Sequence, residues 1–171
     1  RVEELVDAME AGGVNCIDLY TPNPEFRSNL GRALRGRREK FVLQAHLCTI
    51  WKDGQYKRTR DLAEVKEGFA DQLRRLETDH AEIGMIHYVD SLADWETVRT
   101  GGVLDYAREL KAQGVIRAIG LSSHNPEVAL ADHEKIFAGI LQRRAELAAE
   151  AIEESADRWS LSLPRIENSL L

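Results

Sequence analysis

The chain has little of what marks a membrane, secreted or nucleic-acid-binding protein. No apolar run approaches the roughly 18 residues that span a bilayer, and we expect no charged-then-apolar leader before Arg1. The densest basic run, residues 35–40, is more typical of a solvated turn than of a nucleic-acid surface. We therefore expect a cytoplasmic protein with no membrane and no nucleic-acid partner. Cysteine is also scarce, and Cys16 and Cys48 lie in or beside apolar runs where a free thiol packs as a small hydrophobe.

The bulk composition is that of an ordinary globular domain. The chain has 171 residues, of which 43% are hydrophobic and 30% are charged, with a net charge of −6. This length is enough for one domain with a substantial core, or for part of a larger domain. Acidic and basic residues are interspersed along the chain instead of forming blocks, and the composition is far from that of a disordered protein.

Four short apolar runs each end at polar or titratable side chains. Helix-patterned stretches separate these runs, and this alternation predicts an α/β fold with a parallel sheet. The carboxyl ends of parallel strands lie on one side of a sheet, so we expect the terminal side chains to converge there. The runs and their ends are VNCIDLY with Asp18, KFVLQAHL with His46, AEIGMIHY with His87, and IRAIGLSSHN with Ser122, Ser123 and His124.

The stretches between the runs carry clear helix signals. Apolar residues recur at a helical period in residues 2–9, and Asp61 suits the N-cap of a helix that continues to about residue 78. The connection CTIWKDGQYKRTR, residues 48–60, reads as a polar loop that is long for its position, and we consider it a candidate for function.

The pattern changes near Ala131. Residues 132–171 are rich in alanine and glutamate and lack the alternation with strands, which predicts a long amphipathic helix followed by a short tail. We therefore divide the chain into an α/β part, residues 1–131, and a helical C-terminal segment, residues 132–171.

A carboxylate and two imidazoles at neighbouring strand ends suit acid–base chemistry. Asp18 at the end of a buried strand needs a partner, and His46 is the nearest candidate, so we expect this pair to favour the imidazolium. With His87 opposite, the three groups could polarise a carbonyl oxygen and give it a proton. Two histidines and one aspartate are also a known metal-ligand set, which leaves a metal-assisted hydrolase as an alternative.

Four stretches in order resemble the aldo/keto reductase family. They are GGVNCIDLY, NLGRALRGRREKFVLQ, QLRRLETDHAEIGMIHYVD and LKAQGVIRAIGLSSHNPE, and the resemblance extends to about residue 130. It implies a (β/α)8 TIM barrel that reduces a small-molecule carbonyl, an aldehyde or a ketone, with NADPH or NADH. Some relatives of this kind carry a cysteine-rich iron–sulfur segment, and this chain has no such cluster of cysteines.

The resemblance carries the family's catalytic residues over only in part. Asp18 and His87 match the family's aspartate and histidine, whereas the lysine position is occupied by His46 and the tyrosine position by Asn23. Tyr20, two residues after Asp18, could stand in as the acid if the strand continues. The candidate catalytic residues are Asp18, His46, His87, Tyr20 and Asn23. The resemblance also assigns Ser122 and Ser123 to the nicotinamide carboxamide.

By the family pattern the chain begins after the first barrel strand and loses the resemblance after the fifth. We therefore expect a partial barrel of about four parallel strands, in a truncated or fragmentary form of an oxidoreductase. Open sheet edges would be free to pair with a second copy, so a catalytically silent binding or assembly module is the main alternative.

Overall fold

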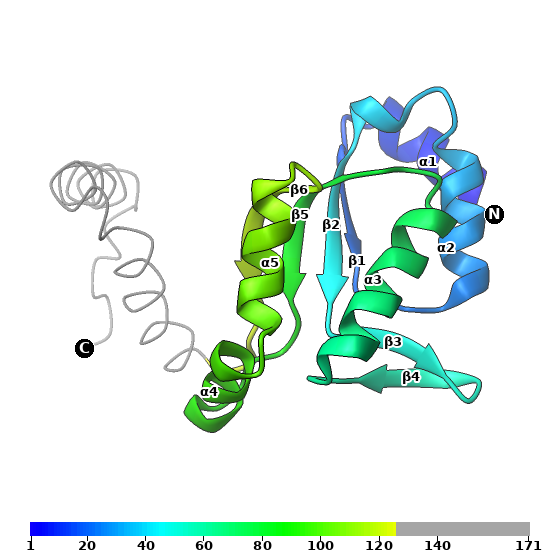
Figure 1. Ribbon diagram of the computed structural model, residues 1–171. Coiled ribbons are helices and arrows are strands. Elements are labelled where there is room, and N and C mark those ends of the chain that lie inside the picture. Colours follow the sequence, from blue (N-terminus) through cyan, green and yellow to red (C-terminus); the bar gives the residue numbers. More distant parts are fainter. Residues whose placement is uncertain (126–171) are drawn as a thin grey trace, which may run out of the picture. The chain divides into compact units, whose positions relative to one another are not determined.

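The strands form a four-stranded parallel sheet with the order β1-β2-β5-β6 (Figure 1). The computed structural model describes residues 1–125, so the predicted helix in 132–171 and the boundary near 131 lie outside the described residues. The four strands fall on the four apolar runs, which confirms the predicted α/β class and the parallel sheet. Their bounds are β1 Cys16–Leu19, β2 Val42–Leu47, β5 Ala81–Ile86 and β6 Ile116–Leu121.

Helices connect the strands, and several begin at side-chain caps. Asp61 accepts a hydrogen bond from the backbone N–H of Glu64, as predicted, and Ser91 caps the next helix in the same way. No helix within residues 1–125 is long and apolar enough to cross a membrane. The helices are α1 Val2–Ala11, α2 Pro24–Ala33, α3 Leu62–Arg75, α4 Leu92–Thr100 and α5 Val103–Ala112, with a 3-10 turn η1 at Arg38–Lys40.

The two faces of the sheet differ in burial. Figure 1 shows α3 and α5 over one face of the sheet. Leu19, Leu43 and Ile86 share one face by the strand register, and they are fully buried, which places them under these helices. Alternate residues, including Asp18 and His46, lie on the opposite face. Cys16 shares that face and is exposed, so the expectation that it packs in the core is wrong. Strand periodicity therefore places the candidate site on the face without these helices.

The connection between β2 and α3 is a β-hairpin, which corrects the prediction of a long polar loop. Strands β3 (Thr49–Lys52) and β4 (Gln55–Arg58) pair in antiparallel fashion. Their two-residue turn is Asp53-Gly54, and both residues have positive φ, 52° and 78°, as a type I′ turn requires. Glu64 of α3 accepts hydrogen bonds from both lysines of the hairpin and from Thr59, so the hairpin is tied to α3.

Gly31 lets α2 approach α3 closely. A Cβ atom at this position would lie 2.3 Å from the carbonyl oxygen of Arg75 and 2.9 Å from the Cα atom of Leu76. Both atoms belong to the backbone, which cannot rotate away as a side chain can. Gly68 has a comparable clash, 2.4 Å, but with the side chain of Ile50.

We expect Gly31→Ala to lower the free energy of unfolding by about 1–3 kcal/mol, because the clash exceeds the gain in helix propensity. The matched change Gly68→Ala should cost less, since the side chain of Ile50 can move. Urea unfolding of the two variants and the wild type measures both effects. A Gly31→Ala variant as stable as the wild type would show that α2 and α3 pack differently.

Candidate functional site

His46 and His87 face each other across neighbouring strand ends. His46 lies near the end of β2, and His87 directly follows β5, its neighbour in the sheet. Their Nδ1 atoms are 2.6 Å apart, and the rings meet edge to face with centroids 4.7 Å apart. Both side chains are buried, at 3% and 0% exposure, so water does not compete for this contact.

Asp18 approaches the other side of the His46 ring from β1. Its Oδ1 atom lies 2.7 Å from Nε2 of His46. The contact does not qualify as an aligned hydrogen bond, so we treat it as a close electrostatic contact. The Asp18 side chain is 56% exposed, and it forms the solvent end of the pair.

Tyr56 extends the cluster on the far side of His87. It lies on β4 of the hairpin, and its hydroxyl is 2.9 Å from Nε2 of His87. The sequence interpretation missed this residue because it treated the segment as a loop. The Asp53-Gly54 turn signal between residues of strand character could have found the hairpin, and with it the position of Tyr56.

The Nδ1–Nδ1 contact restricts how protons are arranged. Two imidazole nitrogens at 2.6 Å need one proton between them, because two bare nitrogens or two N–H groups would repel. The carboxylate of Asp18 favours a proton on Nε2 of His46, which leaves its Nδ1 as the acceptor. His87 then donates from Nδ1, and its Nε2 accepts from the Tyr56 hydroxyl. In this tautomer pair both rings are neutral, and both nitrogens of His87 have a hydrogen-bond partner.

Burial lowers the pKa of both histidines. For His46, burial lowers the pKa by more than Asp18 raises it. For His87, burial together with the positive charges of nearby groups lowers the pKa to about 4. Asp18 favours the imidazolium of His46, as expected, but loss of solvation outweighs the carboxylate, so the pKa of His46 is lowered overall.

The two serines lie beside His87 at the end of β6. Ser122 Oγ accepts a hydrogen bond of 2.9 Å from the backbone N–H of Tyr88, and its own hydroxyl hydrogen has no acceptor among residues 1–125. Ser123 Oγ lies 3.3 Å from Asp90 Oδ1 and 3.1 Å from the carbonyl oxygen of Asn125, and these contacts engage its hydroxyl. Ser122 is thus the better placed of the two to bind a ligand amide.

Two of the predicted site residues do not join the cluster. The side-chain oxygen of Asn23 accepts from the backbone N–H of Phe26 at 2.9 Å, so Asn23 acts as the N-cap of α2. Tyr20 follows the last residue of β1 and is 54% exposed, with no hydrogen bond to another residue of 1–125. The sequence alone did not show that Asn23 and Tyr20, unlike Asp18, lie outside the cluster.

A metal site finds no support in the described part of the chain. Within residues 1–125, no group of three or more histidine, cysteine, aspartate or glutamate side chains is arranged to hold a metal ion. The Nδ1 atoms of His46 and His87 face each other, and this contact uses the nitrogens that a shared metal would need.

The chain is similar to known reductases. The model of the Aldo/keto reductase family matches residues 2–155. Aldo-keto reductase YhdN of Bacillus subtilis is 32% identical over 100 residues, 57% of this chain and 29% of that protein. Uncharacterized oxidoreductase YqkF of Bacillus subtilis is 31% identical over 130 residues, 72% of this chain and 40% of that protein. Aldo-keto reductase AKR11C1 of Bacillus halodurans, in its holo form, has a TM-score of 0.62 at 29% identity and covers 75% of this chain and 43% of its own. The chain spans less than half the length of each of these relatives.

We expect acid to destabilise the protein through His87. The folded ring stays neutral down to a pKa of about 4, whereas an unfolded histidine binds a proton near pH 6.5, so stability falls as the pH drops through this window. Between about pH 7 and about pH 5, the wild type should lose about 2 kcal/mol more than His87→Gln. Urea unfolding at both pH values measures the difference, and equal losses in the two proteins would contradict the lowered pKa.

Proposed function

Because the chain belongs to the aldo/keto reductase family, we propose that its strand ends form the proton-donating part of a carbonyl reductase. The substrate class is a small aldehyde or ketone, and the hydride source is NADPH or NADH. One observation carries this proposal, the unbroken line of contacts from Asp18 through His46 and His87 to Tyr56. The chain spans less than half the length of these relatives. We therefore propose the complete reaction on the basis of the family.

Tyr56 is the proposed proton donor. The Tyr56 residue is 42% exposed, and its hydroxyl contacts Nε2 of His87. Burial raises the pKa of Tyr56, which keeps the phenol protonated at neutral pH. Tyr20, which the sequence suggested for this role, has no hydrogen bond or ring contact with either histidine within residues 1–125.

The histidines are proposed to resupply the proton. One extra proton on His46 lets its Nδ1 donate to His87, whose Nε2 then donates to the oxygen of Tyr56, and the phenol proton is free to leave. When Tyr56 protonates the carbonyl oxygen, each ring passes one proton along. After these transfers the two histidines are left as the neutral tautomer pair described above. Asp18 stabilises the starting state, in which His46 carries the extra proton.

The fit to a nicotinamide is limited to its amide end. Ser122 retains a donor hydrogen that could bind the carboxamide oxygen, and Ser123 could assist if it released Asp90. A nicotinamide bound there would supply a hydride to the carbonyl carbon, which with the proton from Tyr56 gives the alcohol. We assign no residue of 1–125 to the phosphates or the adenosine.

The competing proposal is a catalytically silent module that assembles through its sheet edges. Within residues 1–125, β1 and β6 are the outer strands of the sheet, which is the observation in its favour. Titration with NADPH, followed by tryptophan fluorescence, separates the two proposals. We expect saturable quenching, and its absence together with self-association would favour the module. The expected cytoplasmic location is part of the reductase proposal.

We expect Tyr56→Phe to lower kcat for carbonyl reduction by about 100-fold with little change in KM, because only the proton donor is removed. Tyr20→Phe and Tyr106→Phe, the latter on α5, serve as controls and should stay near wild-type rates. Loss of nicotinamide absorbance with an aldehyde substrate measures the rates. A large loss in Tyr20→Phe with none in Tyr56→Phe would assign the donor to Tyr20 instead.

The pH profile of kcat should show that the reaction requires an extra proton on the histidine pair. We expect kcat to rise as the pH falls below about 6.5, because the pKa of His46 and of His87 lies below that of a free histidine. Asp18→Asn should move this rise to lower pH, since the carboxylate raises the pKa of His46. A profile that Asp18→Asn leaves in place would show that this contact has no part in proton loading.

A further inference from the structure

Arg27 is a buried cation without full compensation. Its side chain projects from α2, is 1% exposed, and donates from Nε to the carbonyl oxygen of Thr21 at 3.0 Å. Its Nη2 atom has no hydrogen-bond partner among residues 1–125. An unpaired, buried guanidinium group is costly, because the surroundings do not replace the water that it has lost.

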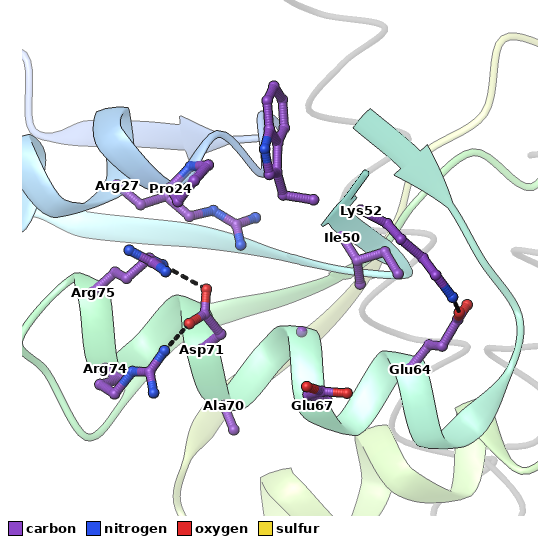
Figure 2. A pocket seen from close by; sticks show the side chains of 12 residues that line it. Pro24, Arg27, Ile50, Lys52, Glu64, Glu67, Ala70, Asp71, Arg74 and Arg75 are labelled. Atoms are coloured by element: carbon purple, nitrogen blue, oxygen red, sulfur yellow. Dashed lines mark hydrogen bonds and ion pairs between the residues drawn. The ribbon is translucent and has the colours of Figure 1, made fainter. Parts of the chain in front are cut away.

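The Arg27 guanidinium lines a cavity of about 590 Å³ between α2, β3 and α3. Figure 2 shows the side chain reaching into the space between Asp71 and Ile50. This cavity lies between the two helices and the hairpin. Its lining residues include neither Tyr56 nor the two histidines. It is therefore a feature separate from the cluster of histidines.

Positive charge is in excess at the Arg27 end of the cavity. Arg74 and Arg75 share one carboxylate, that of Asp71, as the dashed lines in Figure 2 show. Burial and the charge of Arg75 together lower the pKa of Arg27 to about 10, although Asp71 raises it. Three guanidinium groups thus have a single carboxylate among them at this end.

The rest of the cavity favours an apolar body and disfavours an anionic group. Lys52 and Glu64 form an ion pair with each other, and Glu67 adds a further carboxylate on α3. The two carboxylates outnumber the one ammonium group, so this part of the cavity would repel an anion. Apolar or small residues complete the lining: Pro24, Ile50, Trp51, Gly68 and Ala70.

We propose that this cavity binds a small organic anion, with its carboxylate or phosphate group on Arg27 and Arg75 and its apolar body along Ile50 and Trp51. The anion would supply the missing acceptor for Nη2 of Arg27, and guanidinium groups bind such oxygens with two parallel hydrogen bonds. The site goes beyond the proposed reduction and does not depend on it.

The same anion would influence the histidine cluster. The positive charge of Arg27 contributes to the lowered pKa of His46, so a bound anion should raise that pKa. Arg27 also holds Thr21, three residues after Asp18, through its Nε hydrogen bond. A ligand bound to Arg27 would therefore act on the segment that follows β1 and carries Thr21.

Calorimetry with benzoate, phenyl phosphate and the uncharged analogue benzamide tests the site in the full 171-residue chain. We expect saturable binding of at least one of the two anions, with a Kd of about 1 mM or below, and binding at least about tenfold weaker for benzamide. Quenching of tryptophan fluorescence should accompany binding, and Trp51→Phe should lose this signal, because Trp51 lines the cavity. Equal binding of benzamide, or no saturable heat with either anion at about 10 mM, would overturn the proposal.

Variants locate the anion. Arg27→Met and Arg75→Gln should each weaken anion binding by about tenfold, whereas Arg99→Gln, which removes an exposed arginine of α4, should leave it unchanged. If Arg27→Met does not fold, Arg75→Gln and the comparison with benzamide decide the matter. Undiminished binding in Arg75→Gln, with folded Arg27→Met equally unaffected, would place the anion elsewhere and contradict the assignment.

Discussion

The contact between the Nδ1 atoms of His46 and His87 is the constraint on which the site depends. At 2.6 Å it holds only if one proton lies between the two rings, and burial keeps water from supplying another partner. The position of the proton on one ring therefore determines its position on the other. Asp18 and Tyr56, at the two ends, complete a line in which each group's state is set by its neighbours.

The fold supports this line from several directions. Parallel strands bring Asp18, His46 and His87 to one side of the sheet, because β1, β2 and β5 are consecutive neighbours. The hairpin adds Tyr56 from outside the sheet, and Glu64 of α3 holds the hairpin through Lys52, Lys57 and Thr59. These three partners lower the pKa of Glu64 to about 2, so the anchor remains charged across the working pH range.

The sequence predicts the sheet better than it predicts the site. The four strands are apolar runs with polar ends, and their order follows from βαβ connections, so Asp18, His46 and His87 could be placed together. The hairpin was missed because its strands have only four residues each and expose most of their side chains. Tyr56 was missed with it, since a contact across 31 positions has no local pattern. The unpaired Nη2 of Arg27 was equally invisible, because burial of a charged side chain depends on packing that the sequence does not display.

The most direct test of the account is ¹⁵N NMR of the imidazole rings near neutral pH. We expect two neutral rings of opposite tautomer, with His46 protonated at Nε2 and His87 protonated at Nδ1. Because the rings are coupled across the short contact, replacing one histidine by glutamine should change the ring ¹⁵N shifts of the other. Two rings that are both protonated at Nε2, or that titrate independently near pH 6.5, would contradict the proton line from Asp18 to Tyr56.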